Sequence, residues 1–128
     1  MRYLALDVGD RTIGLAVGEE EFGLARPLGT VRRRSVAADL AALREIVGKE
    51  DVGALVIGLP LNLEGEVGHQ AARVRTFAQA ARALDRPIEL VDERFTTAEA
   101  ARRGAGDLDA GAAVVLLEDF FSARRRRS

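Results

Sequence analysis

Three carboxylates stand where a chain that only had to fold would place apolar residues. Asp7 ends an apolar stretch near the amino terminus, Glu93 ends a later one, and Asp109 shares the apolar face of the last predicted helix. An unpaired carboxylate is costly to remove from water, so such groups are usually paired, protonated or bound to a metal. The three together predict a site for hard divalent cations, which prefer oxygen ligands.

The composition restricts the chemistry to oxygen ligands. The 128 residues include no cysteine and one histidine, which excludes a thiolate site and argues against structural zinc. A hydrophobic fraction of 48% and a charged fraction of 30% are typical of a globular protein, and the length predicts one domain over residues 1–128. Without a membrane-span or signal-peptide pattern, we expect a cytoplasmic protein with no membrane partner.

The charge pattern gives little direction by itself. A net charge of −1 provides no overall attraction to nucleic acid. Arginines cluster at 32–34 and 124–127, and both clusters are expected to be solvated, with salt-sensitive phosphate contacts as the alternative. His69 lies in a glycine-rich stretch and is expected to be a surface residue rather than a general acid.

The elements that must position these carboxylates begin with three strands. Residues 3–8 alternate, with Asp7 on the face opposite Leu4. After a tight turn at 9–11, a second strand places small residues on one face, where the backbone is expected to be approached closely: Gly14, Ala16 and Gly18. A third strand within 24–31 contains Pro27, which predicts a sheet edge. Short links between the strands predict an antiparallel meander.

The pattern then changes to helices alternating with strands. Ser35 is a candidate N-cap, and residues 54–58 form a continuous apolar run typical of a central strand. Further elements are a strand at 87–91, a short helix capped by Thr96 or Thr97, and a helix over 109–121. The inward helical positions are predicted to be Val36, Leu40, Leu43 and Val47, then Val74, Phe77, Ala78, Ala81 and Leu84. This order predicts an α/β fold with a mixed sheet and helices on its faces.

Each carboxylate also has a purely structural interpretation. Asp109 could cap the last helix, unless Asp107 is the cap. Asp7 could accept hydrogen bonds from backbone amides at a turn. Glu93 could belong to a solvated strand end and pair with Arg94. The combination of all three, on elements that this topology brings to one sheet edge, favours the metal site.

Four motifs in order make the chain similar to a known family. They are Leu6-Asp7-Val8-Gly9 with Gly14-Leu15-Ala16-Val17, Gly58-Leu59-Pro60-Leu61-Asn62 with Gly65, Asp92-Glu93-Arg94-Phe95-Thr96-Thr97 with Glu99-Ala100, and Asp109 with Ala112-Ala113. This set resembles the YqgF/RuvX family of bacterial RNase H-like nucleases, relatives of the Holliday-junction resolvase RuvC. The resemblance covers essentially the whole chain.

The resemblance implies a fold, a site and a substrate. The fold would be RNase H-like, with a five-stranded mixed sheet made of the antiparallel meander plus two parallel strands, and helices on both faces. Asp7, Glu93 and Asp109 would be catalytic and hold two Mg²⁺ or Mn²⁺ ions for phosphodiester hydrolysis. The reaction would mature the 5′ end of pre-16S rRNA, with ribosomal precursor particles as further partners. The protein would be a monomer or a homodimer.

Several residues are expected to contact the nucleic acid. Gly9 and Gly14 would let a phosphate backbone approach the first hairpin. The remaining candidates are Asn62, Arg94, Thr96 and Thr97, of which the threonines could instead cap a helix and Arg94 could hold Asp92.

Other functions fit part of the pattern. The first is a resolvase or exonuclease acting on branched or single-stranded DNA, since two-metal hydrolysis does not by itself read the sugar. The second is a nucleic-acid-binding module without catalysis, against which the three carboxylates argue. The third is an actin-like ATPase, suggested by the first hairpin, although such enzymes close two domains around ATP and 128 residues supply one.

Overall fold

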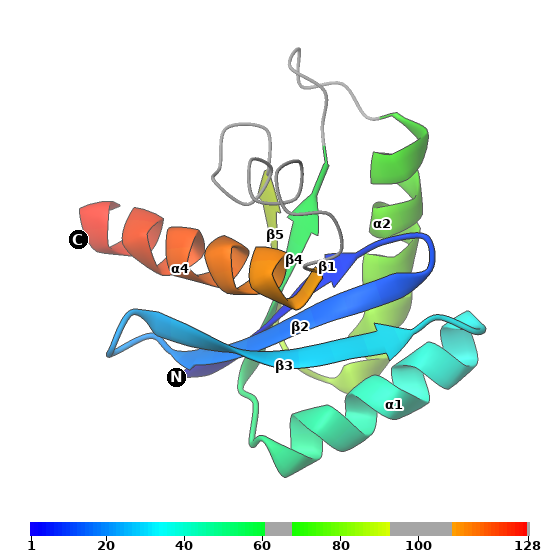
Figure 1. Cartoon of the computed structure of the whole chain (residues 1–128), viewed down its shortest axis with the longest axis horizontal. Coiled ribbons are helices and arrows are strands. Elements are labelled where there is room, and N and C mark those ends of the chain that lie inside the picture. The colour runs from blue at the N-terminus through cyan, green and yellow to red at the C-terminus, as the bar shows by residue number, and fades with distance from the viewer. Residues whose placement is uncertain (61–67, 93–108, 128) are drawn as a thin grey trace.

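The sheet has five strands, and the first strand of the chain lies at its centre (Figure 1). The computed structural model describes residues 1–60, 68–92 and 109–127, apart from the side chains of His69 and Asp109. The strands are β1 (Arg2–Val8), β2 (Thr12–Glu19), β3 (Leu24–Arg32), β4 (Ala54–Leu59) and β5 (Ile88–Asp92). In the order β3-β2-β1-β4-β5, the first three strands are antiparallel, and β4 is parallel to both β1 and β5. The predicted meander and mixed sheet are confirmed.

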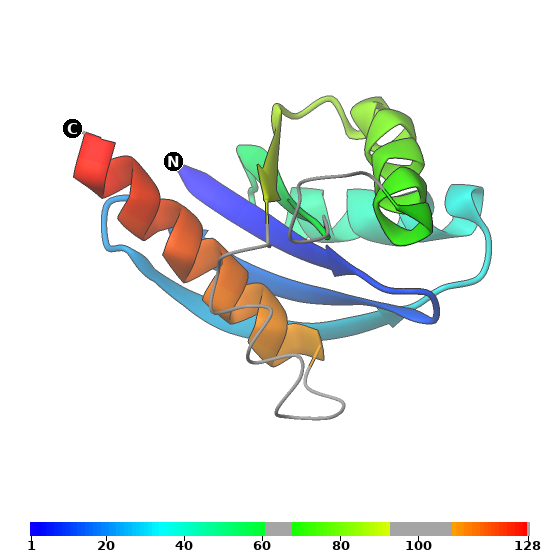
Figure 2. The same ribbon diagram turned by 90° about the horizontal axis from the view of Figure 1, so that it is seen from above.

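Helices cover the two faces of this sheet. They are α1 (Val36–Lys49), α2 (His69–Ala80), the short 3-10 helix η1 (Ala81–Leu84) and α4 (Asp109–Arg127). Figure 2 shows α1 and α2 on one side of the sheet and α4 on the other. The predicted helix capped by Thr96 or Thr97 falls outside the described residues.

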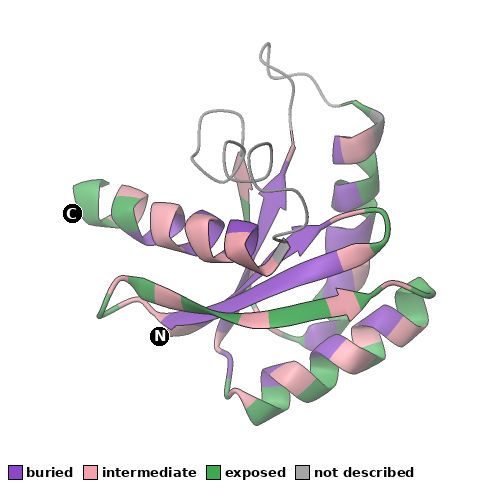
Figure 3. Cartoon of the chain, in the orientation of Figure 1, coloured by how far each residue is buried: buried purple, intermediate pink, exposed green. Residues whose placement is uncertain are grey.

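Strict alternation along β1 divides the interior into two cores. Leu4, Leu6 and Val8 pack with residues of α1 and α2. Tyr3 and Ala5 pack on the opposite face with residues of α4. Figure 3 shows β1 and β4 as buried strands in the middle of the molecule. Because side chains alternate, Asp7 belongs to the α4 face.

The edge strand β3 and the close approach at Gly18 follow the sequence pattern. Pro27 lies on β3, which is an edge strand of the sheet. The N–H group that proline lacks is tolerated there because an edge strand pairs on one side only. A Cβ atom at Gly18 would lie 2.4 Å from the backbone oxygen of Leu24. The close neighbour is therefore the backbone where β3 begins, and only glycine fits at this point of β2.

The buried face of α1 differs from the predicted one. Ser35 caps the helix as predicted, its hydroxyl accepting a hydrogen bond from the Ala38 N–H at 3.1 Å. The buried residues are Asp39, Leu43 and Val47, a row with a spacing of four. Val36 is 42% exposed, so its predicted inward position is wrong. The buried place in the first turn is taken by Asp39, because that carboxylate has partners in the segment that leads into the helix.

The second half of the chain follows the predicted pattern more closely. The five predicted inward positions of α2 and η1 are all buried: Val74, Phe77, Ala78, Ala81 and Leu84. Helix α4 runs to Arg127, beyond the predicted end at Phe121. Its last turn is arginine-rich, and cations there complement the negative end of the helix dipole.

Candidate active site

Asp7 is a buried carboxylate near the end of the central strand. It is 7% exposed, and its ladder partner on β2 is Gly14, which has no side chain to fill the space beside it. The face it shares with Tyr3 and Ala5 is the one that α4 covers. Local sequence places it there, because an alternating strand that buries its even positions under α1 and α2 must direct position 7 to the other side.

Of the elements next to the other two predicted carboxylates, α4 lies on this same face and β5 is an edge strand of the sheet. Asp109 is the first residue of α4, which lies against β1, β2 and β3, although its side chain is outside the described part of the structure. Glu93 directly follows Asp92, the last residue of β5, and is itself outside the described residues. Val91 on β5 packs against the α4-side core. Among the described side chains, which include neither Glu93 nor Asp109, no three His, Asp or Glu groups are placed to bind a metal.

The predicted substrate contacts are only partly described. Asn62, Arg94, Thr96 and Thr97 lie outside the described residues. Gly14 is the ladder partner of Asp7, and Gly9 opens the turn between β1 and β2. The Gly9 N–H donates to the Thr12 carbonyl at 2.9 Å, and a Cβ atom at Gly9 would lie 3.0 Å from that oxygen. Gly9 thus has a structural reason to be glycine, and its contact with substrate stays a prediction.

Comparison with known proteins decides the family. The model of the family described as RuvX, Holliday junction resolvase, matches residues 1–123. Relatives provisionally named pre-16S rRNA nucleases occur in Anaeromyxobacter sp. strain Fw109-5, at 43% identity over 97% of this chain and 98% of the relative, and in Thermus thermophilus, at 45% over 95% and 98%. The chain belongs to the RuvX family. Its enzyme class follows: it is a nuclease, a hydrolase of phosphodiester bonds, as the motifs predict.

Solved structures place this RuvX-family chain in the RNase H-like fold. Thermus thermophilus RuvC, in complex with a Holliday junction substrate, aligns over 98% of this chain and 96% of its own length, with a TM-score of 0.61 and 17% identity. A fowlpox virus resolvase bound to Holliday junction DNA aligns with a TM-score of 0.60 at 6% identity, over 97% of this chain and 99% of its own. At these identities the likeness shows the fold, which the sequence predicted. In the described ranges, no helix of this family member is long and apolar enough to cross a bilayer.

No sequence pattern predicted the group that anchors the hairpin bearing Asp7. The carboxylate of Asp39, 2% exposed, accepts from Arg33 Nε at 3.3 Å and from the Arg34 N–H at 3.0 Å. Arg33 in turn donates through Nη1 to the Gly9 carbonyl at 3.0 Å, and its guanidinium lies 5.1 Å from the Phe77 ring centre. A buried charge on α1 is thereby connected to the turn that follows Asp7. The one sequence feature that could have indicated this group is the position of Asp39, four residues before Leu43 and therefore on the same helical face.

A second set of contacts fixes α4 over Asp7's face of the sheet in this RuvX-family nuclease. Tyr3 contacts the rings of Phe120 and Phe121, with centroid distances of 5.2 and 5.7 Å, and burial raises the pKa of its phenol. Arg124 Nε lies 2.5 Å from Glu20 Oε2, an ion pair that raises the pKa of the guanidinium. Arg124 also lies over the Phe120 ring at 5.3 Å. The arginine run expected to be a solvated tail therefore includes a residue that ties the helix to the sheet.

Proposed function

We propose that residues 1–128 form one metal-dependent nuclease domain whose catalytic centre consists of Asp7, Glu93 and Asp109. The observation that carries the proposal is the buried carboxylate of Asp7, beside a residue without a side chain, on the sheet face that α4 covers. A buried carboxylate is tolerated only where it is hydrogen-bonded, paired or bound to a cation. The position of Asp109 at the start of α4, and of Glu93 next to the last residue of β5, supports a shared site.

The donor set fits Mg²⁺ or Mn²⁺. All three proposed ligands are carboxylates, which hard ions prefer, and the sequence offers no thiolate and one imidazole. When bound, such ions supply the Lewis acidity for hydrolysis of a phosphodiester. Asp7 would hold its position through the central strand, whose neighbours on both sides are β2 and β4. Gly14, its ladder partner, has no side chain that would keep a phosphate group from approaching the sheet.

The substrate that we propose is the 5′ precursor segment of 16S rRNA, acted on in the cytoplasm within or beside ribosomal precursor particles. Support comes from the relatives provisionally named for this reaction, which match nearly the whole chain at 43% and 45% identity. A second candidate is a four-way DNA junction. It is favoured by the family description and by the RuvC likeness.

Cleavage assays test both parts of the proposal. Single-stranded RNA, single-stranded DNA and a four-way junction are each incubated with Mg²⁺, Mn²⁺ or EDTA. Asp7→Asn is expected to reduce cleavage by more than about 100-fold, since even groups that only orient metal ligands cost 10–100-fold. The matched control is Asp10→Asn, which removes an exposed carboxylate of the same hairpin whose partner is Arg73 at 3.0 Å.

Each outcome has a definite meaning. Metal-dependent cutting that Asp7→Asn loses and Asp10→Asn keeps supports the centre, and preference for RNA supports rRNA processing. Preference for the junction, together with a two-fold dimer in solution, favours the resolvase. Full activity of folded Asp7→Asn overturns the assignment of the catalytic centre.

A further inference from the structure

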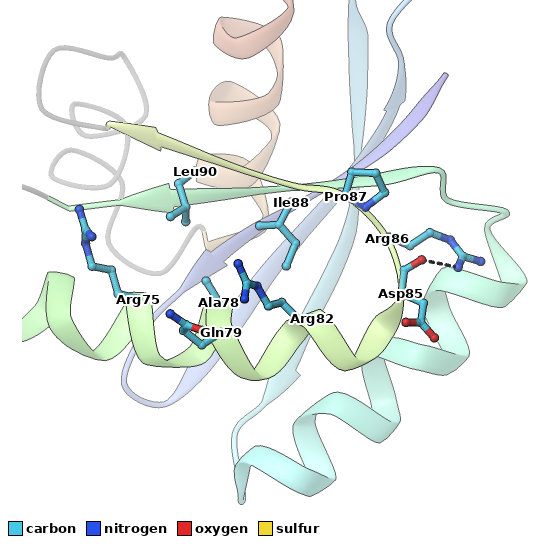
Figure 4. Close-up of a pocket in the computed structure, with 9 residues that line it drawn as sticks. All are labelled: Arg75, Ala78, Gln79, Arg82, Asp85, Arg86, Pro87, Ile88 and Leu90. Atoms are coloured by element: carbon cyan, nitrogen blue, oxygen red, sulfur yellow. Dashed lines mark hydrogen bonds between the residues drawn. The ribbon is translucent and has the colours of Figure 1, made fainter.

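A groove between α2 and the edge strand β5 combines free cationic groups with an apolar floor. It has a volume of about 550 Å³. Its charged lining residues are three arginines, Arg75, Arg82 and Arg86, and one carboxylate, Asp85, and its floor is formed by Ala78, Pro87, Ile88 and Leu90. Figure 4 shows the side chains of Arg75 and Arg82 reaching from the helical side toward β5. Leu90 is 45% exposed, an apolar side chain left open on an edge strand.

The three arginines are not equivalent. Arg86 is held by the protein, because its Nε donates to the Val52 carbonyl at 2.8 Å and its Nη1 to the Asp85 carbonyl at 3.1 Å. Arg75 and Arg82 are exposed, and within the described ranges neither forms an ion pair or a side-chain hydrogen bond. Two guanidinium groups are therefore available to a ligand, beside a surface that apolar or aromatic groups can cover.

We propose that this groove is a second contact site for the nucleic acid, binding a single-stranded segment outside the catalytic centre. Guanidinium groups bind phosphate oxygens in a bidentate manner and stack on bases, and apolar floors accept the faces of bases of any sequence. This inference rests on the proposed nuclease function and specifies how the substrate is held. The groove serves affinity and carries no part of the hydrolysis.

The groove lies on the α1/α2 face of the sheet, opposite the α4 face that bears Asp7, and β5 is the edge strand around which a bound segment would pass. The strand leads from Ile88 at the groove to Asp92, which directly precedes Glu93 in the sequence. Four residue steps at about 3.3 Å each give a path of about 13 Å. A stacked strand advances about 3.4 Å per nucleotide, so a segment that also passes around the sheet edge would need more than about four nucleotides between the cleaved bond and the groove.

The test measures binding without cleavage. A fluorescein-labelled single-stranded RNA of 12 nucleotides is titrated with protein in EDTA, and anisotropy is followed at several KCl concentrations. Arg75→Gln/Arg82→Gln is compared with Arg26→Gln/Lys49→Gln, which removes the same charge from β3 and from the end of α1, at two residues that do not line the groove. Circular dichroism confirms that both variants are folded.

The groove variant is expected to bind the RNA about tenfold more weakly than the wild type, the loss of roughly one base-stacking contact. Its slope of log K against log salt is expected to decrease by about 1.4, or 0.7 for each lost phosphate contact. The control variant is expected to stay within about twofold of the wild type. Arg75→Lys/Arg82→Lys is expected to keep the salt slope and lose affinity, because lysine retains the charge without the planar surface.

Four results would overturn the inference. They are an unchanged RNA affinity of the groove variant, equal losses of affinity in the groove and control variants, and no RNA binding by the wild type. The fourth is that an oligoglutamate of 12 residues displaces the labelled RNA as well as unlabelled RNA does, which would make the groove a site for acidic peptides. Metal-dependent cleavage is measured on the same preparations. If the wild type cleaves but the groove variant binds normally, the groove assignment fails while the proposed nuclease centre stands.

Discussion

Removing the Asp39 carboxylate should destabilise the protein and loosen the hairpin that carries Asp7. Asp39 is 2% exposed, whereas the Arg33 side chain is 22% exposed. In Asp39→Ala, the guanidinium loses its charged partner and the Arg34 N–H loses its acceptor at 3.0 Å. Breaking a buried pair on one side typically costs about 3–5 kcal/mol. Arg33 keeps its contacts with the Gly9 carbonyl and the Phe77 ring and has some access to water, so we expect about 2–4 kcal/mol.

Urea unfolding of a double-mutant cycle measures the pair. The cycle comprises the wild type, Asp39→Ala, Arg33→Ala and the double variant, and its coupling free energy is expected to exceed about 1 kcal/mol. Asp10→Asn is the exposed control: its ion pair with Arg73 is 64% exposed on each side, and we expect a cost below about 1 kcal/mol. If the effects of the two single substitutions on the free energy of unfolding are additive, with a coupling near zero, Arg33 and Asp39 do not act as one anchor.

The same cycle distinguishes anchoring from simple stability. Arg33 donates to Gly9, two residues after Asp7, so its loss should reduce cleavage at temperatures where every variant is still fully folded. Arg33→Lys keeps a charge but cannot satisfy Asp39 and the Gly9 carbonyl in the same fork geometry. We expect this variant to recover part of the lost stability and little of the lost cleavage activity. Cleavage that follows only the folded fraction would show that Arg33 does not position the hairpin.

Two further predictions concern packing and pH. Gly18→Ala places a Cβ atom 2.4 Å from the Leu24 oxygen and should lower the free energy of unfolding in urea by about 1–3 kcal/mol. Gly48→Ala in α1 has nothing within 4 Å of the new Cβ atom and should raise it by about 0.5–1 kcal/mol. Equal effects of the two substitutions would contradict the contact geometry. Burial raises the pKa of Tyr3 above its ordinary value of 10, so the unfolded state ionises first and the stability present below pH 10 is lost as pH rises through the folded-state pKa. Tyr3→Phe should reduce the loss of stability as pH rises above about 10, and an unchanged slope would exclude Tyr3 as its source.

The parts of the fold that the sequence predicted are those governed by short-range periodicity. Alternation in β1 predicts which side chains enter each of the two cores, and Pro27 predicts the sheet edge. The position of α1's buried face was predicted wrongly at Val36 because it depends on Asp39, whose partners Arg33 and Arg34 precede the helix. A polar residue with a tertiary partner can replace an apolar one on a helical stripe, and periodicity does not reveal the partner.

For the site, the sequence predicted three carboxylates, and the structure adds the contacts that hold the hairpin bearing Asp7. The burial of Asp7 follows from its place in an alternating strand, so it was predictable. The anchor from Asp39 through Arg33 to Gly9 was not, because it joins α1, the segment after β3 and the first turn, which meet only in the folded chain. The proposed roles of Glu93 and Asp109 rest on sequence and on the elements next to them.

Two sets of contacts, one on each face of β1, suggest how this small nuclease keeps the buried carboxylate of Asp7 in position. On one side, Asp39 and Arg33 fix the turn after Asp7 from the α1 face. On the other, Tyr3 and the pair of Arg124 with Glu20 fix α4 above it. A site built between layers is only as precise as the contacts that hold those layers. Disturbing either anchor should therefore impair cleavage more than an equally destabilising cavity elsewhere, such as Val47→Ala in α1, and that comparison separates positioning from stability.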